Sequence, residues 1–135
     1  MIKIVLAMHG SLALYFKEEA ERILGNQEDF YAIPLSRQDS PEIMHERLRA
    51  VVGQGPSIIL VDFPGGTPCN CALGLCRTLD RVLIISGVNF PMILSALTAR
   101  RFKTYEELAA GIEEEGKKAI RNLTGEMKDD NSHSH

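Results

Sequence analysis

The stretch SIILVDF at residues 57–63, followed by PGGTP at 64–68, decides the fold of this chain of 135 residues. The run SIILV is almost wholly apolar and does not alternate with polar residues, which is typical of a parallel strand buried on both faces. Asp62 interrupts the apolar run, and the two glycines at 65–66 predict a tight turn before a helix at about 70–79. The stretch therefore reads as a strand, a turn and a helix.

The same alternation extends in both directions from this unit. Further strands are predicted at 2–7, 30–35 and 81–86, and helical periodicity at 12–24, 41–52, 89–101 and from 104. Ser40-Pro41 and the capping-box pair Thr104 and Glu107 indicate two helix starts. Apolar strands that alternate with helices predict an α/β fold, a flavodoxin-like, doubly wound, mainly parallel sheet with helices on both faces.

Length and composition suit one globular domain, expected at 1–124, with a polar, disordered tail at 125–135. Apolar residues make up 44% of the chain, and the formal net charge of −3 argues against nucleic-acid binding. The sequence has no apolar run near the roughly 20 residues of a membrane span. The start, MIKIVLAMHG, lacks the features of a signal peptide, so we expect a cytoplasmic protein.

Three cysteines, Cys69, Cys71 and Cys76, lie close together in the sequence. Their odd number argues against a disulfide framework, and their spacing matches no common zinc pattern. We interpret them as small buried residues of one helix, and we expect neither a metal nor a cofactor.

Polar residues follow three of the predicted strands. His9-Gly10-Ser11 comes after the first, Asp62 ends the third, and Ser86-Gly87-Val88-Asn89 comes after the fourth. Ligands of such sheets bind beyond the carboxyl ends of the strands, so we expect His9 and Asp62 to meet there. A carboxylate that accepts the N–H of one imidazole nitrogen fixes the tautomer and leaves the other nitrogen as a nucleophile.

The glycine-rich turn adds an anion site to this pair. Gly65 and Gly66 allow close approach of the backbone, and the following helix presents free N–H groups to a phosphate. Gly10 and the hydroxyls of Ser11 and Thr67 complete the predicted phosphate site. Taken singly, the histidine could be a turn residue, Asp62 a helix cap and GGTP a simple turn. Their conjunction at one edge of the sheet puts phosphoryl chemistry on an equal footing with these structural interpretations, although no nucleotide-binding loop is present.

Three blocks then carry a family resemblance: IVLAMHGSLA at 4–13, LVDFPGGTPCNCA at 60–72 and ISGVNFPMILSAL at 85–97. With them, the chain resembles the IIA domain of the mannose/fructose/sorbose class of the bacterial phosphoenolpyruvate-dependent phosphotransferase system. The similarity extends from residue 1 to about 124. It departs from the family at Phe63-Pro64, where the position before the glycines is often a bulky side chain.

The resemblance implies a role for each matching residue. His9 would take a phosphoryl group from phospho-HPr and pass it to a IIB component of a sugar transporter, Asp62 would orient His9, and Thr67 would face the phosphoryl group. It also implies a homodimer that reaches the membrane only through its partners. Because the chain stops after this domain, the IIB component is expected as a separate polypeptide.

Two other functions stay open on the sequence. One is the phosphocarrier subunit of a dihydroxyacetone kinase, which resembles this chain in fold and in its N-terminal histidine. The other is a non-catalytic regulatory module of the same fold. GGTPCN and SGVNFPM favour the sugar-transport function, and His9 with Asp62 speaks against the regulatory module. The sequence does not identify the sugar.

Overall fold

Four parallel strands form the central sheet in the computed structural model, which describes residues 1–53 and 55–133. The sheet has the order β2-β1-β3-β4, which confirms the flavodoxin-like fold. The strands are β1 (Lys3–His9), β2 (Phe30–Leu35), β3 (Ser57–Val61) and β4 (Val82–Ser86). Because the chain passes from β1 to β2 on one side and later to β3 on the other, the order reverses between β1 and β3. In sheets of this kind, ligands bind beyond the carboxyl ends of the strands at such a reversal.

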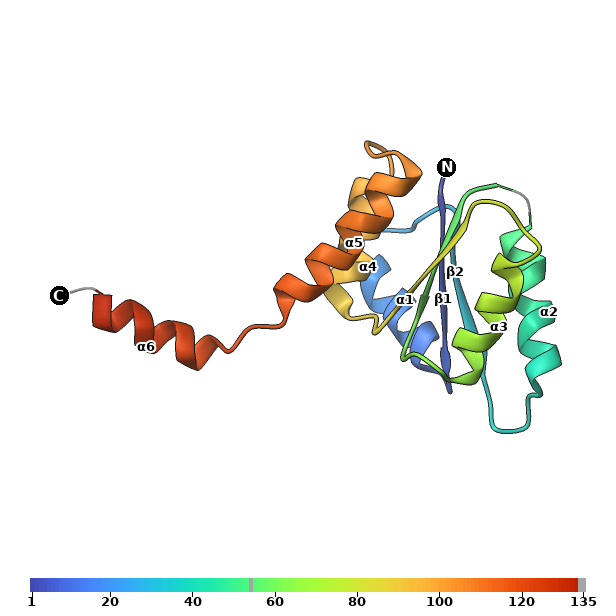
Figure 1. Cartoon of the computed structure of the whole chain (residues 1–135), viewed down its shortest axis with the longest axis horizontal. Coiled ribbons are helices and arrows are strands. Elements are labelled where there is room, and N and C mark those ends of the chain that lie inside the picture. The colour runs from blue at the N-terminus through green and yellow to red at the C-terminus, as the bar shows by residue number, and fades with distance from the viewer. Residues whose placement is uncertain (54, 134–135) are drawn as a thin grey trace.

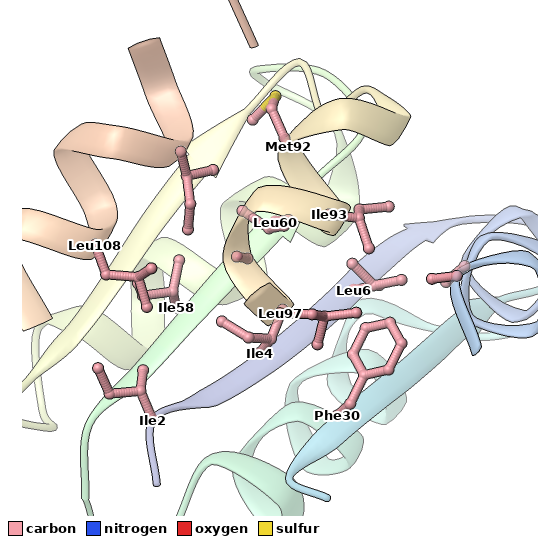
Figure 2. Packing of buried hydrophobic residues seen from close by; sticks show 14 of the residues in the cluster. Ile2, Ile4, Leu6, Phe30, Ile58, Leu60, Met92, Ile93, Leu97 and Leu108 are labelled. Carbon is pink, nitrogen blue, oxygen red and sulfur yellow. The ribbon is translucent and has the colours of Figure 1, made fainter. Parts of the chain in front are cut away.

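Helices cover both faces of the sheet (Figure 1). One face carries α1 (Leu12–Leu24), α4 (Phe90–Ala99) and α5 (Tyr105–Ala119), and the other carries α2 (Pro41–Val52) and α3 (Thr67–Cys76). The strands are apolar on both faces because each face has its own core. In β1, for example, Ile4 and Leu6 belong to the first core, whereas Val5 and Ala7 belong to the second. Figure 2 shows the first core, where α4 lies over the side chains of β1 and β3.

The predicted helix starts at Ser40 and Thr104 are confirmed. Ser40 Oγ accepts a hydrogen bond from the Ile43 N–H, and Thr104 forms the expected capping box with Glu107. The helix after the glycine turn, α3, begins at Thr67 rather than near Asn70. Gly66 serves as its N-cap, and Pro68 fits its first turn. Pro34 lies within β2, since a strand at the edge of the sheet tolerates its missing N–H.

The end of the chain differs from the prediction. A disordered tail was expected from Gly125, but Leu123–His133 form a sixth helix, α6, which stands apart from the domain (Figure 1). Asn122 Oδ1 accepts a hydrogen bond from the Gly125 N–H, and Arg121 forms an ion pair with Glu126 across the first turn. These local contacts stabilise the first turn of α6. The polar composition of the segment, from which disorder was predicted, gives no sign of them. Residues 134–135 of the expected tail lie outside the described residues.

Within residues 1–53 and 55–133, the structure contains no helix that is both long enough and apolar enough to cross a membrane.

Candidate active site

His9 and Asp62 meet at the carboxyl ends of β1 and β3. These strands are neighbours, with Ala7 opposite Val61, so the residues that end them come out side by side. Asp62 Oδ2 lies 2.8 Å from His9 Nδ1 and also accepts the His9 backbone N–H at 2.9 Å. The Asp62 side chain is 13% exposed and that of His9 is 41% exposed. The pair is therefore held by the protein on one side and open to solvent on the other.

The hydrogen bond between the two side chains fixes the histidine tautomer. A carboxylate can only accept, so His9 Nδ1 carries the hydrogen and donates it. The other ring nitrogen, Nε2, then keeps its lone pair. This is the arrangement that prepares an imidazole for nucleophilic attack.

Asp62 is held in its charged form. Burial raises the pKa of this carboxyl, but the hydrogen bonds from the His9 backbone and ring and from the Phe63 N–H together hold the pKa below its ordinary value. The Phe63 N–H donates to Asp62 Oδ1 at 3.1 Å, so both carboxylate oxygens have donors. A fixed negative charge therefore stands beside the imidazole.

Phe63 is a site residue that sequence reasoning missed. Its ring stacks on the imidazole of His9, with centroids 4.8 Å apart and planes only 2° from parallel. The side chain remains 50% exposed. The only signal in the sequence was the departure from the family at Phe63-Pro64, which does not say where the aromatic ring goes.

The turn at 65–66 closes around the same imidazole. A Cβ on Gly66 would lie 2.7 Å from His9 Cε1 and 2.8 Å from Phe63 Cε2, closer than real Cβ atoms come. Gly65 has a φ of +86°, in the left-handed region that favours glycine. The Asn70 side-chain amide donates to the Gly65 carbonyl oxygen at 3.3 Å, which ties the turn to α3. The close contact concerns Gly66 alone, since a Cβ on Gly65 would meet nothing within 4 Å. The approach of both glycines to an anion stays a prediction.

Two helices begin next to this pair. Gly66 is the N-cap of α3 and Ser11 that of α1, and neither helix start receives a side-chain cap from the described residues. Their first N–H groups are available to an anion, and the positive end of each helix dipole adds to the attraction. Ser11 is exposed and Thr67 is half-buried at these helix starts, and Gly10 adopts a φ of +60° between β1 and α1.

The loop after β4 has a structural task. Asn89 caps α4 by accepting the Met92 N–H at 3.1 Å, and its amide donates to the Gly116 carbonyl oxygen of α5 at 3.0 Å. The Val88 N–H donates to the Val61 carbonyl oxygen, which anchors the loop at the end of β3. Asn89 therefore joins α4 to α5 while its loop supports the strand end that carries Asp62.

The cysteines agree with their interpretation as packing residues. All three are free thiols on α3, with Cys69 and Cys71 buried and Cys76 half-buried.

Comparisons with known proteins give one matching family and several similar relatives. The family described as "PTS system fructose IIA component" matches residues 3–113. The PTS system fructose-specific EIIA component of Bacillus subtilis (strain 168) is 29% identical over 112 residues, which cover 80% of this chain and 77% of that protein. The PTS system mannose-specific EIIAB component of Escherichia coli (strain K12) is 31% identical over 127 residues. That match covers 90% of this chain but only 39% of the relative's length.

Solved structures share the fold. The phosphotransferase system component EIIA from Streptococcus agalactiae superposes with a TM-score of 0.87 at 24% identity, over 93% of this chain and 99% of that one. The mannose/sorbose specific IIA subunit from Enterococcus faecalis superposes with a TM-score of 0.83 at 27% identity, over 89% of this chain and 92% of that one.

Proposed function

The chain belongs to the family of fructose IIA components of the phosphotransferase system, as its three sequence blocks indicated, and from this premise we propose that His9 carries the phosphoryl group. His9 accepts it from phospho-HPr and donates it to a IIB component during sugar uptake. One observation carries the proposal: Nδ1 of a half-exposed histidine is bonded to a charged carboxylate at 2.8 Å. That bond leaves Nε2 as the nucleophile.

The transfer is a displacement at phosphorus. The Nε2 lone pair of His9 forms a bond to the phosphorus of phospho-HPr, and the bond between phosphorus and the donor imidazole breaks. Nδ1 keeps its hydrogen throughout, so the ring becomes positively charged as the new bond forms. The Asp62 carboxylate stabilises this charge. The low solvent exposure of its side chain strengthens the interaction, because little water screens it. Donation to the IIB component reverses these steps.

The helix starts beside His9 support binding of the transferred group. The first N–H groups of α3, with Gly65, Gly66 and the Thr67 hydroxyl, would donate to phosphoryl oxygens from one side. The hydroxyl and backbone N–H of Ser11 would do so from the start of α1. Gly10, which the sequence also predicted as a donor, would not, because its N–H already donates to the Leu35 carbonyl oxygen at 2.7 Å. This scheme requires no metal or cofactor, since the N–H groups at the helix starts and the hydroxyls donate hydrogen bonds to the phosphoryl oxygens.

The proposed partners are proteins, namely HPr, a IIB component and a second copy of this chain. The protein would act in the cytoplasm, without nucleic acid, and would meet the membrane transporter only through its partners. Its relatives differ in the sugar after which they are named, since one is fructose-specific and another mannose-specific. The His9 site does not determine which sugar is transported, because it binds only the phosphoryl group.

A relay assay tests this function. The full chain is phosphorylated with radiolabelled phosphoenolpyruvate, enzyme I and HPr, then separated and mixed with candidate IIB proteins. We expect the label to pass to a IIB protein within seconds, and the His9→Gln variant to take up none. Transfer to a dihydroxyacetone-kinase nucleotide subunit instead would identify the alternative phosphocarrier. A chain that takes no label from phospho-HPr would be the non-catalytic module.

A further inference from the structure

The aromatic contact at His9 goes beyond what the proposed transfer requires. Phe63 and His9 lie in parallel planes with centroids 4.8 Å apart, the offset-stacked arrangement that aromatic rings prefer. Two neighbouring contacts fix this geometry. The Phe63 N–H donates to Asp62 Oδ1, and Gly66 approaches both rings so closely that no side chain fits there.

The imidazole is consequently held on three sides. Asp62 binds its Nδ1 edge, Phe63 covers one face, and Gly66 faces Cε1. Rotation of the ring about its bond to Cβ would break the hydrogen bond and the stack together. The direction of the Nε2 lone pair is therefore defined before any donor arrives.

The face of Phe63 also has an electrostatic effect. An aromatic face carries partial negative charge and attracts a cation placed over it. An imidazole that attacks through Nε2 with Nδ1 protonated is neutral before transfer and becomes positively charged once Nε2 has bonded to phosphorus. The stack is accordingly stronger in the phosphorylated form and in the transition state than in the resting form.

We infer that Phe63 is a positioning residue for phosphoryl transfer, whose stacked ring orients the His9 imidazole and stabilises its positive charge. This inference rests on the proposed function of His9. It assigns the role to the ring of Phe63 itself, and not to a contact between Phe63 and a protein partner, although its 50% exposure would permit one.

A small donor separates these two roles. Phosphoramidate needs no protein docking: Nε2 of His9 attacks its phosphorus, the phosphorus–nitrogen bond of phosphoramidate breaks, and ammonia leaves with the electron pair of that bond. The rate of this reaction is measured on the full chain by intact mass, beside the rate with phospho-HPr. The variants are Phe63→Leu and Phe63→Met, which lack a ring, and Phe63→Tyr, which keeps one. Phe102→Leu is the control, because Phe102 is 84% exposed.

We expect both ringless variants to react with phosphoramidate about fivefold more slowly, as the loss of a cation–π contact at an exposed site predicts. The Phe63→Tyr and Phe102→Leu variants should keep the wild-type rate. In proton NMR spectra, the carbon-bound protons of His9 should lose their ring-current shift in the ringless variants and keep it in Phe63→Tyr.

Three results would overturn the inference. Wild-type phosphoramidate rates in the ringless variants, with a raised KM for phospho-HPr, would make Phe63 a partner contact. A Phe63→Tyr variant as slow as Phe63→Leu would show that the ring has no role. If the wild-type chain reacted with neither donor, the proposed function itself would fail, and this result is distinct from the other two.

Discussion

At the scale of single residues, the charge of Asp62 is the part of the site that is most open to test. Replacing Asp62 with asparagine keeps the shape and one acceptor oxygen but removes the negative charge beside the imidazole. We expect the transfer from phospho-HPr to slow by about 10²-fold or more, within the range of acid–base and orienting groups. Asp39→Asn is the matched control, since Asp39 forms an ion pair with Arg47 and not with His9. Rapid-quench kinetics measure both variants, and an unchanged Asp62→Asn rate would reduce Asp62 to a structural role.

The same carboxylate makes stability depend on pH. Its contacts hold the pKa of Asp62 below the ordinary value, so the folded state prefers the charged form. This contribution is present above the unfolded pKa of about 3.9 and is lost as the pH falls through the lower folded pKa. We expect wild type to exceed Asp62→Asn in unfolding free energy in urea at neutral pH, and the gap to shrink towards about pH 3. A gap that is constant with pH would contradict the assignment.

Gly66 tests the space around the imidazole. Its φ of −79° suits alanine, so Gly66→Ala creates no backbone strain, and only the overlap of its Cβ with the rings of His9 and Phe63 remains. Displacement of the nucleophile should slow transfer by about 10²-fold while the protein stays folded. Gly111→Ala is the control, because a Cβ there would meet nothing within 4 Å. Equal transfer rates for the two alanine variants would show that the turn does not hold the ring.

At the scale of helices and strands, the sequence was sufficient wherever apolar pattern and capping chemistry agreed. The strand at Ser57–Val61 is fully buried, so its unbroken apolar run identified it, and Ser40 and Thr104 marked helix starts through their own side-chain bonds. Phe63 was missed because its position depends on the path of the turn at residues 64–66. No periodicity encodes such a path. The meeting of His9 and Asp62 could be predicted because it follows from the strand order alone.

Arg100 shows a long-range contact that the sequence does not reveal. It lies beside the exposed Arg101 at the end of α4, yet it is only 4% exposed. Its guanidinium donates to four oxygens at the amino-terminal ends of β1 and β2, namely the carbonyls of Ile2, Glu28 and Asp29 and the side chain of Gln27. Arg100 thereby joins α4 to the edge of the sheet opposite His9.

We expect Arg100→Met to lower the free energy of unfolding by about 2–4 kcal/mol, because buried carbonyl groups lose their donors. Arg101→Met should change it by less than about 0.5 kcal/mol, as exposed positions do. Urea unfolding followed by circular dichroism measures both values. The folded Arg100→Met protein should still transfer phosphate at the wild-type rate, since Arg100 lies far from the active site along the strands. A loss of less than about 0.5 kcal/mol in Arg100→Met would contradict its bridging role.

At the scale of the whole molecule, apolar surface remains uncovered beyond the sheet. β4 is an edge strand, and three apolar residues near the end of the chain are more than half exposed, namely Ile120 just after α5 and Leu123 and Met127 on α6. A second copy of the chain would cover this surface. We expect a homodimer near twice the chain mass of 15.0 kDa, as closed two-fold pairing requires. The edge of the sheet where His9 lies, at the carboxyl ends of β1 and β3, should remain accessible to HPr and the IIB component.

Light scattering at micromolar concentration tests the dimer. A chain truncated after residue 119 should be monomeric, and a monomeric full chain would refute the pairing. Phosphorylation of His9 in the isolated dimer tests whether the site stays accessible. If the dimer takes no label while its dissociated chains do, the dimer interface covers His9.

The site of phosphorylation tests the central claim most directly. The full chain, with phosphoenolpyruvate, enzyme I and HPr, is followed by intact mass and then by fragmentation that locates the modified residue. Wild type should gain one phosphoryl group on His9. His45→Gln should gain the same, because His45 lies on α2, which covers one face of the sheet, and not at the strand ends with His9. His9→Gln should gain none. Full phosphorylation of His9→Gln, or a wild-type chain that stays unmodified while HPr is phosphorylated, would contradict the account.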